Sequence, residues 1–235
     1  MKSCLLRLML MLMFPASTFA APLQAVLVGD YQPLKAAEAE PLAEGFEASW
    51  LSGLGEALGR DIVLADALAQ ADLRIGKTAS GATYYTSGIA ALAAAESGPA
   101  EWTDLAGEPF CVMVGSPHAA IVVSRFGGIA HAYPSAAQAL IGLKLGECQA
   151  VVGDHLLLRQ IAALPEWRRY NRLLPALEEA IVTLRVEADD AALQRRIEQI
   201  NSSEQGQEAL AEVTQHWIDE VAFQAYVLAD TLDCH

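Results

Sequence analysis

The acidic residue Asp154 has the position in this sequence that points most directly to chemistry. It follows a run of apolar residues at 150–152, which is typical of a strand buried on both faces. Upstream, Gly146 marks the end of an apolar helix pattern. In open α/β sheets, small ligands bind beyond the carboxyl ends of the strands. We therefore expect Asp154 to lie at a ligand-holding edge of a sheet; the alternative is that its carboxylate only caps the helix that begins near His155.

The other residue types give little indication of catalysis or metal binding. The five histidines are scattered along the chain and no CxxC motif occurs, so the spacing does not match a metal site. No histidine has a suggestive spacing from a carboxylate or a serine. His118 and His155 follow predicted loops and are interpreted as surface or capping residues. We therefore expect no cofactor, no metal and no enzymatic activity.

The first 20 residues have the three parts of a secretory signal peptide in order. Lys2 and Arg7 precede an apolar run at 8–14, and residues 18–20 form a small-residue cleavage site. The apolar run is too short to cross a bilayer; a membrane anchor or a disordered leader are the alternatives. We expect export to the periplasm, cleavage near Ala20 and no membrane insertion of the mature chain. About 215 residues remain, enough for one large or two small domains.

The chain is acidic, with 15 basic and 29 acidic residues and a net charge of −14, which becomes −16 without Lys2 and Arg7. Such a surface repels phosphate backbones and anionic lipid headgroups, which argues against nucleic-acid and membrane-surface binding. It favours cationic or zwitterionic ligands, or a basic partner protein. The alternative is that the charge serves solubility alone.

Export also bears on the cysteines, because an oxidising compartment permits disulfides. Cys111 and Cys148 lie at the entrances of two apolar strand candidates, and neighbouring strands would bring them within bridging range. We predict a Cys111–Cys148 disulfide, with Cys234 as the odd cysteine. Free thiols are the alternative.

Apolar periodicity alternates between strands and helices along the chain, which indicates an α/β fold with largely parallel sheets flanked by helices. The predicted strands are 23–28, 62–64, 73–76, 110–114, 148–152 and 181–186, with 89–95 a further strand or helix turn. The predicted helices are 46–58, 119–125, 137–145, 155–163, 189–200 and 203–223. Trp50, Tyr84, Tyr85 and Trp217 are interpreted as core residues.

Six fragments, in chain order, resemble motifs of the family 3 extracellular solute-binding proteins, the periplasmic receptors that bind amino acids and similar small polar molecules for ABC importers. The fragments are 29–34, 45–47, 71–76, 84–88, 104–107 with 115–116, and 146–154. The resemblance implies a type II periplasmic-binding-protein fold with two α/β lobes. The first lobe would hold residues 21–93 plus 188–235 and the second residues 97–184, with a ligand clamped between them by hinge closure.

The same resemblance implies a ligand site between the lobes formed by Tyr31, Thr78, Ser116 and Asp154. Tyr31 would cover an apolar side chain or a cation, Asp154 would pair with an ammonium group, and Thr78 would face the cleft from the first lobe. Ser116 precedes a predicted helix, whose amide groups and dipole could hold a carboxylate. The chain departs from the family in its shortened first lobe and in residues 79–82, which lack the arginine that binds the ligand carboxylate.

Two classes of function follow from the resemblance. The first is a monomeric receptor that holds a small polar solute, amino-acid-like or cationic, for an inner-membrane ABC permease. The second is a degenerate solute-binding fold that serves as an accessory protein of a periplasmic quinoprotein dehydrogenase. An enzyme is a third class, because some relatives of the family are periplasmic dehydratases acting on prephenate-like substrates. Fold analogy alone does not support that class here.

Overall fold

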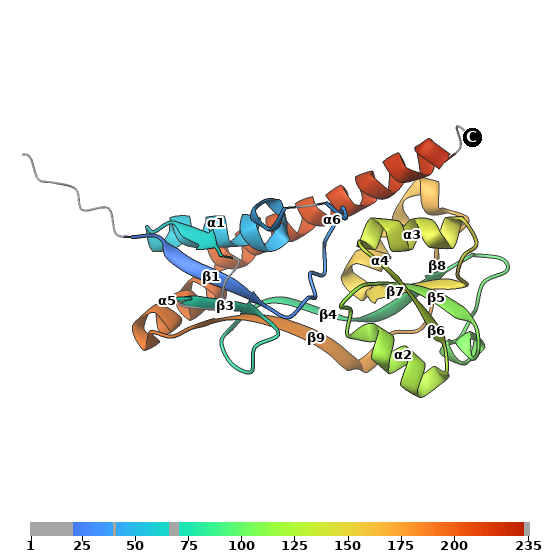
Figure 1. Cartoon of the computed structure of the whole chain (residues 1–235), viewed down its shortest axis with the longest axis horizontal. Helices are drawn as coiled ribbons and strands as arrows, with labels where there is room; N and C mark the ends of the chain where they lie inside the picture. Colours follow the sequence, from blue (N-terminus) through green and yellow to red (C-terminus); the bar gives the residue numbers. More distant parts are fainter. Residues whose placement is uncertain (1–20, 40, 66–70, 233–235) are drawn as a thin grey trace, which may run out of the picture.

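The computed structural model describes residues 21–39, 41–65 and 71–232 (Figure 1). The predicted signal peptide at 1–20 and the odd cysteine, Cys234, lie outside the described residues. Within these three ranges, none of the helices has the combined length and apolarity that crossing a bilayer requires.

The strands form one mixed sheet in the order β2-β1-β3-β9-β4-β7-β5-β6, with β8 pairing to β4. They are β1 (Leu23–Val28), β2 (Ile62–Leu64), β3 (Leu73–Gly76), β4 (Ala82–Ala93), β5 (Pro109–Met113), β6 (Ile129–Tyr133), β7 (Ala150–Asp154), β8 (Arg172–Leu173) and β9 (Leu177–Ala188). The helices are α1 (Phe46–Leu58), α2 (His118–Phe126), α3 (Ala136–Lys144), α4 (His155–Ala163), α5 (Ala191–Ser202) and α6 (Glu204–Leu232), with 3-10 turns η1 (Leu42–Glu44), η3 (Trp102–Leu105) and η4 (Pro165–Trp167).

The sheet has two parallel arms joined by two long crossing strands. One arm is β2-β1-β3 and the other is β6-β5-β7, each with parallel pairing. The crossing strands β4 and β9 pair antiparallel with each other and with the arms. Figure 1 shows the two groups of elements on either side of this crossing. The α/β class is therefore confirmed. The sheet is mixed, whereas a largely parallel one was expected, because the chain crosses between the arms on β4 and returns on β9 in the opposite direction.

Several element boundaries follow the local sequence. Gly59 adopts the left-handed conformation that ends α1 (φ 68°), as its position after the last periodic leucine predicts. Asp190 caps α5 by accepting from two backbone amides. In contrast, β4 is a single 12-residue strand, whereas the sequence predicted only a further strand or helix turn at 89–95. Its small residues and the register shift after Gly88 concealed its continuity.

The predicted disulfide is present between Cys111 on β5 and Cys148 just before β7, with the Cα atoms 5.7 Å apart. The two strands are parallel neighbours. Their amino ends therefore lie side by side, which gives the two cysteines the proximity that bridging requires. The disulfide fixes the amino end of the β5–β7 pair, opposite the end at which Asp154 lies.

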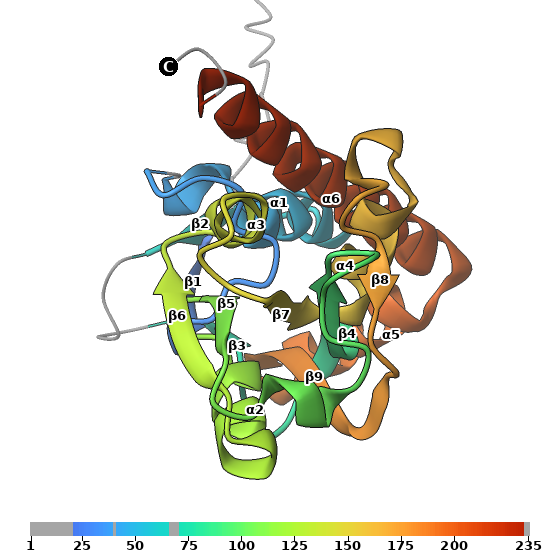
Figure 2. The same cartoon turned by 90° about the vertical axis from the view of Figure 1, so that its right-hand side faces the viewer.

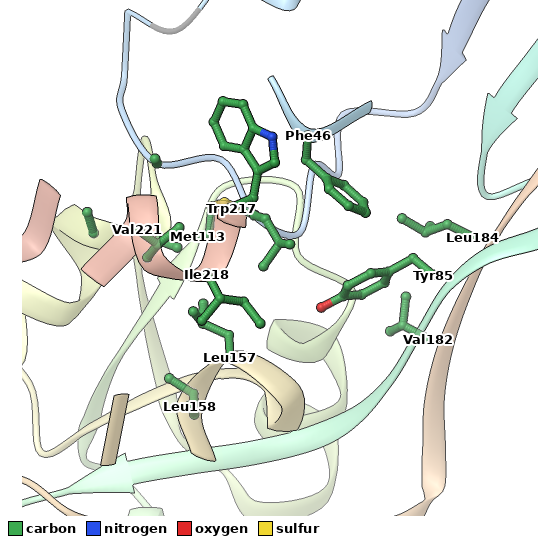
Figure 3. Packing of buried hydrophobic residues seen from close by; sticks show 14 of the residues in the cluster. Phe46, Tyr85, Met113, Leu157, Leu158, Val182, Leu184, Trp217, Ile218 and Val221 are labelled. Atoms are coloured by element: carbon green, nitrogen blue, oxygen red, sulfur yellow. The ribbon is translucent and has the colours of Figure 1, made fainter. Parts of the chain in front are cut away.

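One hydrophobic core continues through both arms of the sheet. Its members include Phe46 and Leu73 from one side and Leu140 and Leu157 from the other. The predicted core aromatics belong to it: Trp50, Tyr84, Tyr85 and Trp217 are buried, and Trp50 stacks on Tyr84. Figure 3 shows side chains from α1, β4, β5, β9, α4 and α6 that pack against one another across the crossing.

The last helix, α6, connects the two groups of elements. It was predicted to end at residue 223 but continues to Leu232, 29 residues in all. It contacts α1 and α5 on one side and α3 and α4 on the other, and Figure 1 shows it running from the side of α1 and α5 to the side of α3. Trp217, Ile218, Val221 and Ala225 form its buried face. Burial of these four side chains stabilises the position of α6 against the helices that it contacts.

Candidate functional site

The side chain of Asp154 lies at the junction of β7 and α4 and is only 2% exposed. Its backbone occupies the N-cap position of α4, but its side chain makes no capping hydrogen bond. The Tyr31 hydroxyl donates to Oδ2 instead, and Nε2 of His118 lies 2.9 Å from Oδ1. The carboxylate therefore joins three segments of the chain, and the interpretation of Asp154 as a simple helix cap is wrong for its side chain.

His118 is the residue that the sequence analysis missed. It was interpreted as a surface or capping residue, but its side chain is fully buried at the first position of α2. Its backbone amide donates to Oγ of Ser116, and its Nδ1 has no hydrogen-bond partner among the described residues. The pair was hidden because 36 residues separate His118 from Asp154. Parallel pairing of β5 and β7 brings the carboxyl ends of the two strands together. An expectation of parallel strands was therefore the signal in the sequence that could have placed His118 near Asp154.

Two phenols surround the carboxylate. Burial, and then the charge of Asp154, raise the pKa of Tyr31 well above its usual range, and the same two causes raise the pKa of Tyr85. The phenols therefore remain protonated at ordinary pH and can donate. The ring of Tyr31 also meets the His118 ring edge-on, with centroids 6.1 Å apart. The result is a compact Tyr31–Asp154–His118 cluster in a largely apolar setting.

Three of the four predicted ligand-binding residues line one cavity. Tyr31, Ser116 and Asp154 border it, together with apolar side chains from β5, β7, α3 and α4. The volume of the cavity is about 20 Å³. A water molecule requires roughly 10–15 Å³ by this measure, so the cavity has room for one water.

Thr78, the fourth predicted residue, is not among the residues that line this cavity. It follows β3, is 8% exposed, and its hydroxyl donates to the carbonyl of Ser80 at 2.7 Å. Arg74 lies on β3, four residues before Thr78, and its guanidinium pairs with Asp189. Nη1 of Arg185 donates to the Thr78 carbonyl at 3.5 Å. Neither guanidinium borders the cavity.

The two arms also meet through their backbones at this place. Gly115 has φ +77°, and a Cβ added there would lie 2.9 Å from the carbonyl oxygen of Asp30. Nearby, the amide of Ala136 donates to the carbonyl of Lys35 at 3.1 Å. The loop that carries Tyr31 is therefore held against the loop after β5 and the start of α3.

Nothing in the part of the chain that the structure describes groups three or more His, Cys, Asp or Glu side chains in a metal-binding arrangement. The cluster has one carboxylate, one imidazole and one engaged phenol. Its hydrogen bonds join Tyr31 and His118 to the carboxylate of Asp154, which is almost entirely shielded from solvent.

Comparison with solved structures identifies the architecture. A mutant of ArgBP from T. maritima superposes with a TM-score of 0.60 at 17% identity, covering 85% of this chain and 96% of that one. The periplasmic binding protein of an arginine transport system from Legionella pneumophila gives 0.57 at 15% identity, covering 84% and 100%. The chain has the fold of a type II periplasmic binding protein.

Other matches support the same periplasmic-binding-protein fold. The GluR0 ligand-binding core, solved with L-glutamate, superposes with a TM-score of 0.57 at 17% identity, covering 85% of this chain and 99% of that one. No protein-family model matches the sequence, and none of the curated proteins does at a significant level. The similarity is therefore one of architecture.

Proposed function

We propose that this protein is an exported, periplasmic member of the solute-binding fold that works by binding another protein, and that its own side chains occupy the place of the ligand. The partner class expected from the resemblance, a periplasmic dehydrogenase, fits this role. The single observation that carries the proposal is the Tyr31–Asp154–His118 cluster.

The cluster already occupies the carboxylate that a ligand would bind. Asp154 is the carboxylate expected to pair with a ligand ammonium, and both its oxygens already have partners in Tyr31 and His118. Ligand pockets for small molecules have volumes of about 300–1,000 Å³, whereas this cavity has about 20 Å³. An amino acid would have to displace Tyr31 or His118 from Asp154. Its ammonium group would then have to replace the lost hydrogen bond, because an unsatisfied buried carboxylate is unfavourable.

Opening the cleft would also disrupt apolar packing. The core is continuous through both arms, and α6 contacts helices on both sides. Gln160 of α4 and Gln215 of α6 exchange hydrogen bonds at 2.7 and 2.9 Å. Hinge motion of the two predicted lobes would expose part of this surface to water at about 25 cal/mol per Å² of apolar area. These contacts support a body that stays closed without a ligand.

A receptor for a small cationic or amino-acid-like solute, serving an ABC permease, is the second candidate. One observation favours it, since Tyr31, Ser116 and Asp154 do gather around one cavity. In that case a ligand ammonium would replace His118 as the partner of Asp154. The missing arginine after Thr78 would leave the ligand carboxylate to the amides near Ser116.

A ligand screen separates the two candidates. The mature protein is unfolded and refolded to remove any retained molecule, and thermal unfolding is then followed with amino acids, polyamines and small organic acids. A bound ligand at 100 times its Kd would stabilise the protein by about 2.7 kcal/mol. The proposal predicts no stabilisation by any compound. Stabilisation that disappears in Asp154→Asn would overturn it and establish the receptor.

A further inference from the structure

The carboxyl-terminal half of α6 carries the most prominent exposed aromatic side chains of the described surface. Phe223, Tyr226 and Val227 are 57%, 53% and 38% exposed. They are spaced at i, i+3 and i+4 and therefore share one face of the helix, opposite the buried Val221 and Ala225. Both views show these last turns extending beyond the rest of the body (Figures 1 and 2). We call Phe223, Tyr226 and Val227 the α6 apolar face.

Acidic residues border the α6 apolar face at both ends. Asp219 lies four residues before Phe223, and Asp230 lies four residues after Tyr226. Helix spacing therefore places both acids on the same stripe, which is about 17 Å long at 1.5 Å per residue. Both acids are exposed.

The electrostatics of α6 are also one-sided. The helix has six acidic residues and no lysine or arginine, and its last turn has no basic residue. The carboxyl end of a helix carries a partial negative charge that cations normally offset. Here the dipole and Asp230 add to one another, so this end of the molecule attracts positive charge.

This charge argues against a second copy of the chain as the occupant. Two α6 apolar faces packed together would bring two negative helices, each with Asp219 and Asp230, into contact. Like charges opposed in an interface disfavour association. A basic partner gains from the same charges, and buried aromatic side chains are the usual anchors of such an interface.

We propose that the α6 apolar face docks a basic amphipathic helix of another exported protein. The apolar side of that helix covers Phe223, Tyr226 and Val227. Its lysines and arginines reach Asp219, Asp230 and the helix end. A partner helix of about three turns matches the length of the stripe. This inference rests on the proposed function, because it identifies the surface and the chemistry of the partner.

The test uses the mature full-length protein and a defined probe. The probe is an 18-residue helical peptide with a leucine face and lysines elsewhere, and its counterpart has glutamate in place of lysine. Binding is followed by fluorescence anisotropy at several salt concentrations. We expect the lysine peptide to bind with an affinity that falls with salt, and the glutamate peptide not to bind.

Matched variants assign the binding to this surface. Phe223→Ala with Tyr226→Ala should weaken the lysine peptide by at least about tenfold, the loss typical of truncating central aromatic anchors. The control, Val123→Ala with Ile181→Ala, truncates two side chains of similar exposure elsewhere (46% and 60%) and should leave the affinity unchanged. Circular dichroism checks that both variants remain folded.

Three results would overturn the inference. They are absence of lysine-peptide binding, equal weakening in the control variant, and a concentration-dependent dimer in sedimentation that Phe223→Ala with Tyr226→Ala abolishes. The last result would make a second copy the occupant. None of these results concerns the cleft. A failure of this inference is therefore distinguishable from a failure of the proposed function, which the ligand screen tests.

Discussion

Removing the hydroxyl of Tyr31 is the sharpest test of the closed site. In Tyr31→Phe, Oδ2 of the buried Asp154 loses its donor, while Oδ1 keeps His118. A hydrogen bond to a charged group is worth about 1.5–3 kcal/mol. The adjacent cavity can admit one water, which would bring the loss towards the lower end of that range. We expect Tyr31→Phe to lower the free energy of unfolding by about 1.5–3 kcal/mol.

The measurement is urea unfolding of the oxidised protein, followed by tryptophan fluorescence with the m-value compared between variants. The matched control is Tyr133→Phe. The hydroxyl of Tyr133 also donates to a carboxylate, that of the exposed Glu147, so its removal should cost less than about 1 kcal/mol.

A double-mutant cycle with Asp154→Asn shows whether the loss passes through the carboxylate. In the Asn background the charge-assisted part of the bond is already gone, so Tyr31→Phe should cost about 1 kcal/mol less than in the native protein. If Tyr31→Phe costs no more than Tyr133→Phe, or if the two substitutions are additive, the hydroxyl is solvated in an open cleft and our account of the site is wrong.

Three further perturbations test neighbouring parts of the structure. Gly115→Ala should destabilise the protein more than Gly127→Ala by about 1–3 kcal/mol. Both glycines have positive φ, but only a Cβ at residue 115 meets backbone atoms, those of Asp30. Equal urea midpoints would mean that the Gly115 loop and the Asp30 loop separate. Reduction of Cys111–Cys148 should cost about 4 kcal/mol for its separation of 37 residues, and an unchanged midpoint after reduction would contradict this. Because the folded-state pKa of Tyr31 is raised, stability should fall as pH rises above about 10, where unfolded phenols lose protons first. Urea midpoints at pH 8 and 10.5 measure this loss, which Tyr31→Phe should reduce.

The sequence predicted the local elements well where periodicity was strong. The helices at α1, α4 and α5 and the strands at β1, β2 and β3 lie within about two residues of their predicted positions, because apolar spacing and caps are local properties. It did not predict β6, the continuity of β4 or the last turns of α6. Those elements are stabilised by strand partners and helix contacts that are distant in the chain.

Asp154 and His118 show where sequence reasoning ends. The position of Asp154 at the end of a buried strand follows from the residues alone, as does the proximity of Cys111 and Cys148 once their strands are neighbours. The partner of Asp154 does not, because burial of His118 depends on the pairing of β5 with β7 and on the packing of the Tyr31 loop against both.

The sequence by itself indicated the α/β class and the cysteine pair, and the family resemblance grouped the loops that carry Tyr31, Ser116 and Asp154. Only the tertiary structure decided that these loops meet around a cavity of one-water size and that α6 connects both sides. The physical reason is that periodicity records which face of an element is buried, whereas the volume left between elements depends on side chains from several distant segments packing at once.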